Sequence, residues 1–170
     1  DAQLEYTLSH SETRLVFTAQ ENRERLEALR AKSGATYEIC VVDPDRLPLP
    51  APRAEDRGEV PIRPGDPAML MYTSGTTGVP KGALLSHANM LSAGRAVAQS
   101  LALTPADRVL SSLPLYHING QCIATVAPLA SGGSIVMPHR FSVSQWWPLV
   151  ERYRPTWLNV VPTIIAYLLN

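Results

Sequence analysis

The chain has few cysteines and no excess of charge, and each of these two features excludes a class of protein. It contains 2 cysteines in 170 residues, 6% aromatic residues, and 15 basic against 15 acidic side chains. Nucleic-acid-binding proteins usually carry a basic surface, so this balance argues against such a role. Cys40 and Cys122 form no CxxC pair and no cluster with histidine. We therefore expect two reduced thiols rather than a disulfide framework.

Long apolar runs are also missing. The most apolar stretch, residues 157–169, is interrupted by Asn159 and Pro162 and is shorter than the roughly 20 residues that cross a bilayer. The first residues are polar, unlike the basic and then apolar pattern of a signal peptide. We therefore expect a cytoplasmic protein without an integral membrane segment. A chain of this length can bury about 70% of its unfolded surface, so it needs no disulfides to stabilise its core.

The apolar residues alternate between short β-like runs and runs with helical spacing. Strands are expected at residues 15–17, 37–42, 68–72, 83–85, 108–113, 134–137 and 156–161. Helices are expected at residues 3–11, 21–32, 87–101, 119–129, 142–153 and 163–169. Strands that alternate with helices of about 10–15 residues are typical of an α/β fold with a mostly parallel sheet.

Several residues predict where helices begin and end. Gly34 is expected to end the second helix. Ser142, with Gln145 three residues later, resembles a capping box, and Pro148 would fit that helix only near its first turn. The positions of the three tryptophans are typical of core residues: Trp146, Trp147 and Trp157. His10 and His139 show no partner pattern and are expected on the surface, whereas His87 is expected to be structural.

Proline divides the chain. Seven of the 15 prolines lie within residues 43–67, where neither a helix nor a central strand can persist. We interpret this segment as an exposed connector between a sublobe of residues 1–42 and a sublobe of residues 68–170. An ordered surface meander without a domain boundary is the alternative.

The most informative segment is the loop Tyr72–Gly82, which follows an expected strand. It combines four hydroxyl side chains, three glycines and one of only two lysines. Glycine allows backbone N–H groups to converge on an anion, and lysine adds positive charge. The loop therefore predicts a phosphate site at the end of a strand, a usual ligand position in α/β sheets. The spacing matches neither the P-loop pattern nor the dinucleotide fingerprint. The candidate phosphate ligands are Thr73, Ser74, Gly75, Thr76, Thr77, Gly78 and Lys81.

The segment YTSGTTGVPKGALLSH, residues 72–87, resembles the phosphate-loop signature of the adenylate-forming (AMP-binding) enzymes. This superfamily includes acyl- and aryl-CoA synthetases, luciferases and adenylation domains of peptide synthetases. LPLYHING, residues 113–120, is similar to the next conserved block, and residues 161–163 and 4–18 resemble further family segments. The resemblance covers essentially the whole chain.

The resemblance implies that the chain is an internal segment of the large N-terminal adenylation domain, with the C-terminal lid domain outside it. ATP and a small carboxylic acid would form an acyl-adenylate, and the acyl group would pass to coenzyme A as co-substrate. The candidate loop would wrap the β- and γ-phosphates, with Mg²⁺ on the phosphates. His117 would lie at the carboxylate and acyl pocket and shape it. Asn119 and Gly120 would line the same pocket.

Other interpretations remain open at this point. The chain could be a non-catalytic nucleotide- or protein-binding module that retained the loop, or part of a carrier-protein ligase or peptide-synthetase adenylation domain. We expect the isolated segment to be inactive and its apolar last helix to be covered by the missing remainder of its own chain. A homodimer is left open.

Overall fold

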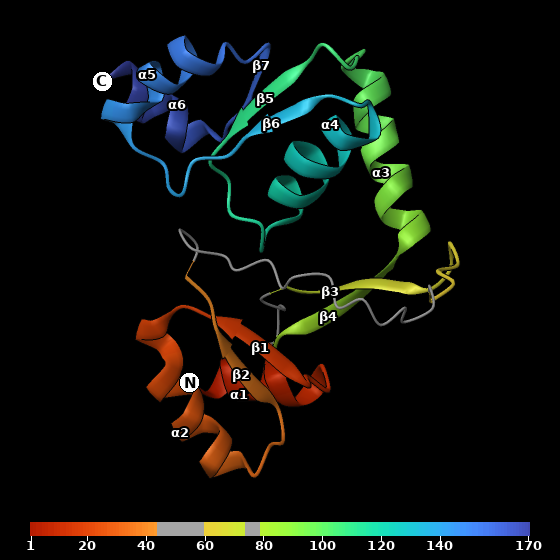
Figure 1. Ribbon diagram of the computed structural model, residues 1–170, viewed down its shortest axis with the longest axis vertical. Coiled ribbons are helices and arrows are strands. Elements are labelled where there is room, and N and C mark those ends of the chain that lie inside the picture. The colour runs from red at the N-terminus through yellow and green to blue at the C-terminus, as the bar shows by residue number, and fades with distance from the viewer. Residues whose placement is uncertain (44–59, 74–78) are drawn as a thin grey trace, which may run out of the picture. The chain divides into compact units, whose positions relative to one another are not determined.

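The computed structural model describes residues 1–43, 60–73 and 79–170. The chain divides into two compact units (Figure 1). The first contains Asp1–Ile62 and Tyr72–Ala83, and the second contains Arg63–Met71 and Leu84–Asn170. Most of the proline-rich segment lies outside the described residues, so the sublobe boundaries expected at residues 42 and 68 stay a prediction.

The first unit begins with two helices and a pair of parallel strands. Its elements are α1 (Ala2–His10), β1 (Leu15–Thr18), a short 3-10 helix (Gln20–Asn22), α2 (Arg23–Ser33) and β2 (Glu38–Val41). β1 pairs with β2 in parallel, from Leu15 opposite Glu38 to Thr18 opposite Val41. Gly34 ends α2 with a φ of 67°, as its position predicted. These elements confirm the helix–strand alternation expected for residues 1–42.

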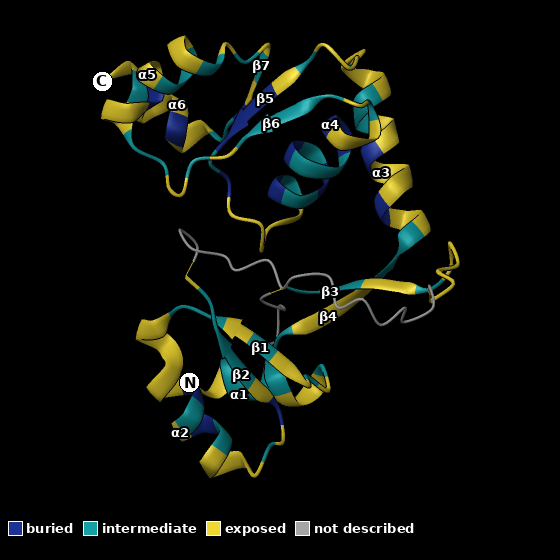
Figure 2. Ribbon diagram, viewed as in Figure 1, coloured by how far each residue is buried: buried dark blue, intermediate teal, exposed yellow. Residues whose placement is uncertain are grey.

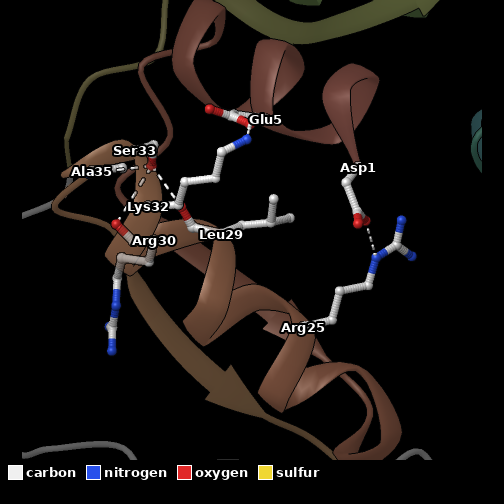
Figure 3. A network of polar contacts seen from close by, with 8 residues as sticks. All are labelled: Asp1, Glu5, Arg25, Leu29, Arg30, Lys32, Ser33 and Ala35. Carbon is white, nitrogen blue, oxygen red and sulfur yellow. Dashed lines mark hydrogen bonds and ion pairs between the residues drawn. The ribbon is translucent and has the colours of Figure 1, made fainter.

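The α1 and α2 helices are joined by polar contacts on their surface (Figure 3). Arg25 contacts Asp1 at 2.7 Å, and Lys32 contacts Glu5 at 3.2 Å. Ion pairs this exposed contribute only about 0–1 kcal/mol each. The buried contacts of α2 are made by Leu26 and Leu29, and the Tyr37 hydroxyl donates to the carbonyl oxygen of Leu26 over 2.8 Å.

The candidate phosphate loop connects β3 (Pro67–Thr73) and β4 (Lys81–Ser86), which form a two-stranded sheet. β4 leads directly into α3 (His87–Ser100). The first turn of α3 has a capping box: the Asn89 amide donates to Ser86 Oγ over 3.2 Å, and the Ser86 amide donates to Asn89 Oδ1 over 3.0 Å. This reciprocal cap fixes where the strand ends and the helix begins.

The second unit contains a three-stranded parallel sheet with the order β6-β5-β7. Its further elements are β5 (Arg108–Ser111), a π-helix η2 (Asn119–Val126), α4 (Ala127–Ala130), β6 (Ser134–Val136), α5 (Val143–Tyr153), β7 (Trp157–Asn159) and α6 (Pro162–Leu169). The expected α/β class with parallel pairing is confirmed. The strands of the described residues form three small sheets rather than one.

The core of the second unit lies around β5 (Figure 2). Val109, Leu110 and Ser111 are fully buried, as expected for the central strand of a parallel sheet. The helix α3 packs against α4 and against the π-helix. A Cβ atom on Gly94 of α3 would lie only 2.5 Å from Cγ1 of Val126, so the absence of a side chain at Gly94 permits this close approach.

The helix expected at residues 119–129 is confirmed, and most of it is π-helical. Two other local predictions for the second unit were wrong. Ser142 is the N-cap residue of α5, but its side chain makes no capping hydrogen bond. Pro148 lies in the second turn of α5 rather than the first, where it removes one helical hydrogen bond.

The tryptophan prediction was right only in part. Trp146 is 1% exposed and packs edge-on against Phe141, and Trp157 is half-buried. Trp147 is 53% exposed. It follows Trp146 directly on α5, and adjacent residues of a helix point to different faces. Cys40 and Cys122 are both free thiols, as predicted.

Candidate active site

The ends of the candidate phosphate loop are held by paired strands. Thr73 is the last residue of β3, Lys81 is the first residue of β4, and both side chains are exposed. The other candidate ligands lie outside the described residues: Ser74, Gly75, Thr76, Thr77 and Gly78. Pairing of β3 with β4 therefore holds Thr73 and Lys81, one on each side of this segment.

The first residue of the loop, Tyr72, is anchored to the first helix. The Tyr72 hydroxyl lies 2.6 Å from Nδ1 of His10. The His10 ring also stacks on Tyr6, with centroids 5.2 Å apart. His10 is exposed, as expected, and its contact with Tyr72 was not predicted. The two residues are 62 positions apart, so no local pattern could have shown the contact.

The second motif forms a tight turn after β5. The His117 amide donates to the carbonyl oxygen of Pro114 over 3.1 Å, and the π-helix then begins at Asn119. A Cβ atom on Gly120 would lie 2.5 Å from the Pro114 carbonyl oxygen. Only glycine permits the π-helix to approach the turn this closely. Residues 113–120 thus form one compact structural unit.

His117 is exposed within this turn. Its ring lies 4.6 Å from the ring of Tyr116, measured between centroids. Among the described residues, its ring nitrogens make no hydrogen bond, which leaves both available to a ligand. His87, by contrast, is the half-buried first residue of α3, and its amide donates to the carbonyl oxygen of Asp66 over 3.1 Å. That contact supports the structural role expected for His87.

A hydrogen bond joins the second motif to the end of a neighbouring strand. Asn159 Nδ2 donates to Asn119 Oδ1 over 2.8 Å. Asn159 is the last residue of β7 and is 8% exposed. The parallel register places it opposite Ser111 at the end of β5. The family resemblance predicts Asn119 in the pocket, but Asn159 was not predicted there. Asn119 follows β5 and Asn159 ends β7, and the carboxyl ends of such neighbouring parallel strands meet.

The structure describes the two parts of the candidate site separately. Thr73 and Lys81 belong to the first unit, whereas His117, Asn119 and Asn159 belong to the second. Across residues 1–43, 60–73 and 79–170, no group of three histidine, cysteine or acidic side chains is placed to hold a metal ion. Within the same ranges, none of the helices has the length and apolar character needed to span a membrane.

Comparison with known proteins now identifies the family. The family model described as AMP-binding enzyme matches residues 1–170. The chain therefore belongs to the AMP-binding enzymes, and the resemblance seen in the phosphate loop and in LPLYHING is confirmed.

Two curated relatives match across nearly the whole chain. A sulfoacetate–CoA ligase of Cupriavidus necator is 51% identical over 172 aligned positions, which cover 99% of this chain and 34% of the relative. The mitochondrial malonate–CoA ligase ACSF3 of Mus musculus is 35% identical and covers 100% of this chain and 30% of the relative. The chain thus spans about a third of the length of these relatives.

Solved structures show the same fold. Apo MatB from Rhodopseudomonas palustris has a TM-score of 0.80 and 31% identity, over 99% of this chain and 33% of that chain. The o-succinylbenzoate coenzyme A synthetase MenE of Bacillus subtilis, in complex with ATP and a magnesium ion, has a TM-score of 0.80 and 30% identity over the same shares. The parallel-sheet units described here are therefore a segment of the adenylate-forming fold.

Proposed function

We propose that the full-length protein is an acid–CoA ligase. It activates a carboxylic acid with ATP, releases pyrophosphate, and transfers the acyl group from the adenylate to the thiol of coenzyme A. The observation that carries this proposal is the match of all 170 residues to the AMP-binding family, together with relatives that are named as CoA ligases.

The chemistry requires a carboxylate to attack the α-phosphorus while the charge of the triphosphate is neutralised. Such a reaction depends on positioning and electrostatic stabilisation. We assign the β- and γ-phosphates to residues 73–78, with Lys81 supplying positive charge at the start of β4. Mg²⁺ keeps several waters and borrows phosphate oxygens, so we expect it to arrive bound to ATP.

The acid is proposed to be short and to carry a second acidic group. Three relatives that match over nearly the whole chain are named for sulfoacetate, malonate and oxalate, each a small acid with two acidic groups. His117 is assigned to shape the pocket for this acid, because its ring is exposed and free of hydrogen bonds within the described part of the chain. Proton transfer is not assigned to it.

The first experiment measures ATP–pyrophosphate exchange by the full-length protein with Mg²⁺ and a panel of acids: sulfoacetate, malonate, oxalate, acetate and a long-chain fatty acid. We expect the diacids and sulfoacetate to support exchange best. The double variant Lys81→Ala with Thr76→Ala should lose more than about tenfold of this activity, because charge and hydroxyl contacts to the phosphates are lost together.

Lys32→Ala is the matched control, since Lys32 is the other lysine of the chain. Its side chain is 72% exposed and contacts Glu5 on the surface, so its loss should leave exchange unchanged. A decrease of less than about twofold in the double variant would contradict the phosphate-loop assignment. If none of the acids in the panel supports ATP–pyrophosphate exchange, the proposed ligase activity is contradicted. Analysis of the product formed in the presence of coenzyme A then identifies the acceptor of the acyl group. In the alternative interpretation, a carrier protein accepts the acyl group in place of coenzyme A.

A further inference from the structure

The turn that carries His117 is tied to the sheet by a side-chain hydrogen bond. Asn119 begins the π-helix two residues after His117, and Asn159 ends β7. The 2.8 Å bond between them connects residues that are 40 positions apart. Asn159 is 8% exposed and its strand pairs with β5, so the anchoring residue belongs to the buried sheet of the second unit.

This bond fixes one orientation of the Asn119 side chain. An asparagine amide presents an oxygen acceptor on one side and two N–H donors on the other. Since Asn159 donates to Asn119 Oδ1, the amide nitrogen of Asn119 points the other way. In the described residues, that nitrogen makes no hydrogen bond. The start of the π-helix, two residues after His117, therefore presents a donor group whose direction depends on Asn159.

The start of the π-helix has little other support from side chains. The residue before it, Ile118, provides no capping hydrogen bond, and the one side-chain bond within the helix runs from Thr125 Oγ1 to the Gly120 carbonyl oxygen. π-Helical segments are rare and occur frequently at functional sites. The hydrogen bond between the buried Asn159 and the half-buried Asn119 therefore supports this segment at its first residue.

We propose that Asn159 is a positioning residue for the acid pocket of the enzyme. It acts through Asn119: by holding the amide oxygen of Asn119, it directs the amide nitrogen, and with it the turn of His117, toward the acid. This inference rests on the proposed ligase function and deepens it. Asn159 itself contacts no substrate in this assignment.

The substitution Asn159→Asp tests the proposal with little change in side-chain volume. An ionised aspartate accepts hydrogen bonds and cannot donate one, so the Asn119 amide must rotate and present its oxygen to the acid. An acceptor facing an anionic substrate is repulsive. We expect KM for the acid to rise on the order of tenfold, the ratio expected when one charge-assisted hydrogen bond is lost. KM for ATP should stay close to that of the wild type, whereas the melting temperature should fall, because a carboxylate replaces an amide that is 8% exposed.

A double-mutant cycle separates this role from a merely structural one. If Asn159 acts through Asn119, then Asn159→Ala should raise KM for the acid in the wild type but add nothing once Asn119→Ala is present. Asn22→Asp is the control for the asparagine-to-aspartate change, because Asn22 is exposed in the first unit and its side chain makes no capping bond. This variant should behave as the wild type.

The outcomes are distinct. A rise in KM for the acid that is non-additive with Asn119→Ala supports the proposal. An unchanged KM for the acid, fully additive effects, or an equal rise in KM for ATP would overturn it while the ligase function stands. If the wild-type protein shows no acid-dependent exchange at all, both this inference and the proposed function fail.

Discussion

A Cβ atom on Gly120 would lie 2.5 Å from the carbonyl oxygen of Pro114 and 3.0 Å from that of Leu113. Both obstacles are backbone atoms, which cannot rotate away as a side chain does. Gly120→Ala should therefore displace either the π-helix or the turn of His117. We expect a loss of about 1–3 kcal/mol in the free energy of unfolding, the usual range for overpacking, measured by urea denaturation, together with a lower rate of pyrophosphate exchange.

Gly65→Ala is the matched control for this prediction. A Cβ atom at Gly65 meets nothing within 4 Å, so its substitution should change the free energy of unfolding by no more than about 0.5 kcal/mol. If both variants lose the same free energy of unfolding, the close approach at Gly120 does not explain the destabilisation.

The sequence contained enough information to predict the parallel strands and the loop between β3 and β4. The runs around Val109 and Leu110 are apolar because a central strand is buried on both faces. Gly34 ends its helix because it adopts a left-handed conformation there. Such signals are local, since each depends on neighbouring residues and on backbone geometry alone.

The features that sequence reasoning missed depend on contacts between distant residues. An apolar helical run does not distinguish an α-helix from a π-helix; here the π-helix approaches both Pro114 and Gly94 closely. The hydrogen bond between Asn119 and Asn159 exists only once β5 and β7 are paired. Trp147 is a residue type that is usually buried, but its side chain lies on the exposed face of α5.

Asp107 should make the stability of the protein dependent on acid pH. Its carboxylate accepts hydrogen bonds from Thr156 Oγ1, the Thr104 amide and Thr104 Oγ1 at 2.8, 2.7 and 2.8 Å. These bonds, that of the Thr156 hydroxyl first, lower the pKa of Asp107 below its ordinary value of 3.8. The stabilisation is thus complete above the unfolded-state pKa and is lost as the pH falls through the lower pKa of the folded state.

The variant Asp107→Asn checks this prediction. It should be less stable than the wild type near pH 7, and the difference in melting temperature should shrink as the pH falls below about 3.8, where the unfolded carboxyl is protonated. Glu24→Gln serves as the control, since Glu24 is exposed on α2. A difference for Asp107→Asn that is constant from pH 7 to pH 3 would contradict the hydrogen-bond explanation.

The two thiols should differ in reactivity. Cys122 is buried in the π-helix, with its Sγ 3.8 Å from the sulfur of Met90, and burial raises the pKa of its thiol. Because the thiolate is the nucleophile, iodoacetamide should label the half-buried Cys40 first in the native protein. Mass spectrometry of tryptic peptides over time measures both rates. Labelling in urea, where the two thiols should react alike, is the control, and faster native labelling of Cys122 would contradict the prediction.

The contact between His10 and Tyr72 should affect ATP binding, because Tyr72 immediately precedes Thr73, the first candidate phosphate ligand. Tyr72→Phe removes the hydroxyl that lies 2.6 Å from His10 Nδ1 but keeps the ring. A hydrogen bond of this kind contributes about 0.5–1.5 kcal/mol, so KM for ATP should rise by about two- to tenfold, with little change in KM for the acid. Tyr6→Phe is the matched control: it also removes one tyrosine hydroxyl, yet the ring that stacks on His10 is kept. If Tyr72→Phe leaves KM for ATP unchanged, or if Tyr6→Phe raises it equally, then the link between α1 and the end of β3 does not position the phosphate loop.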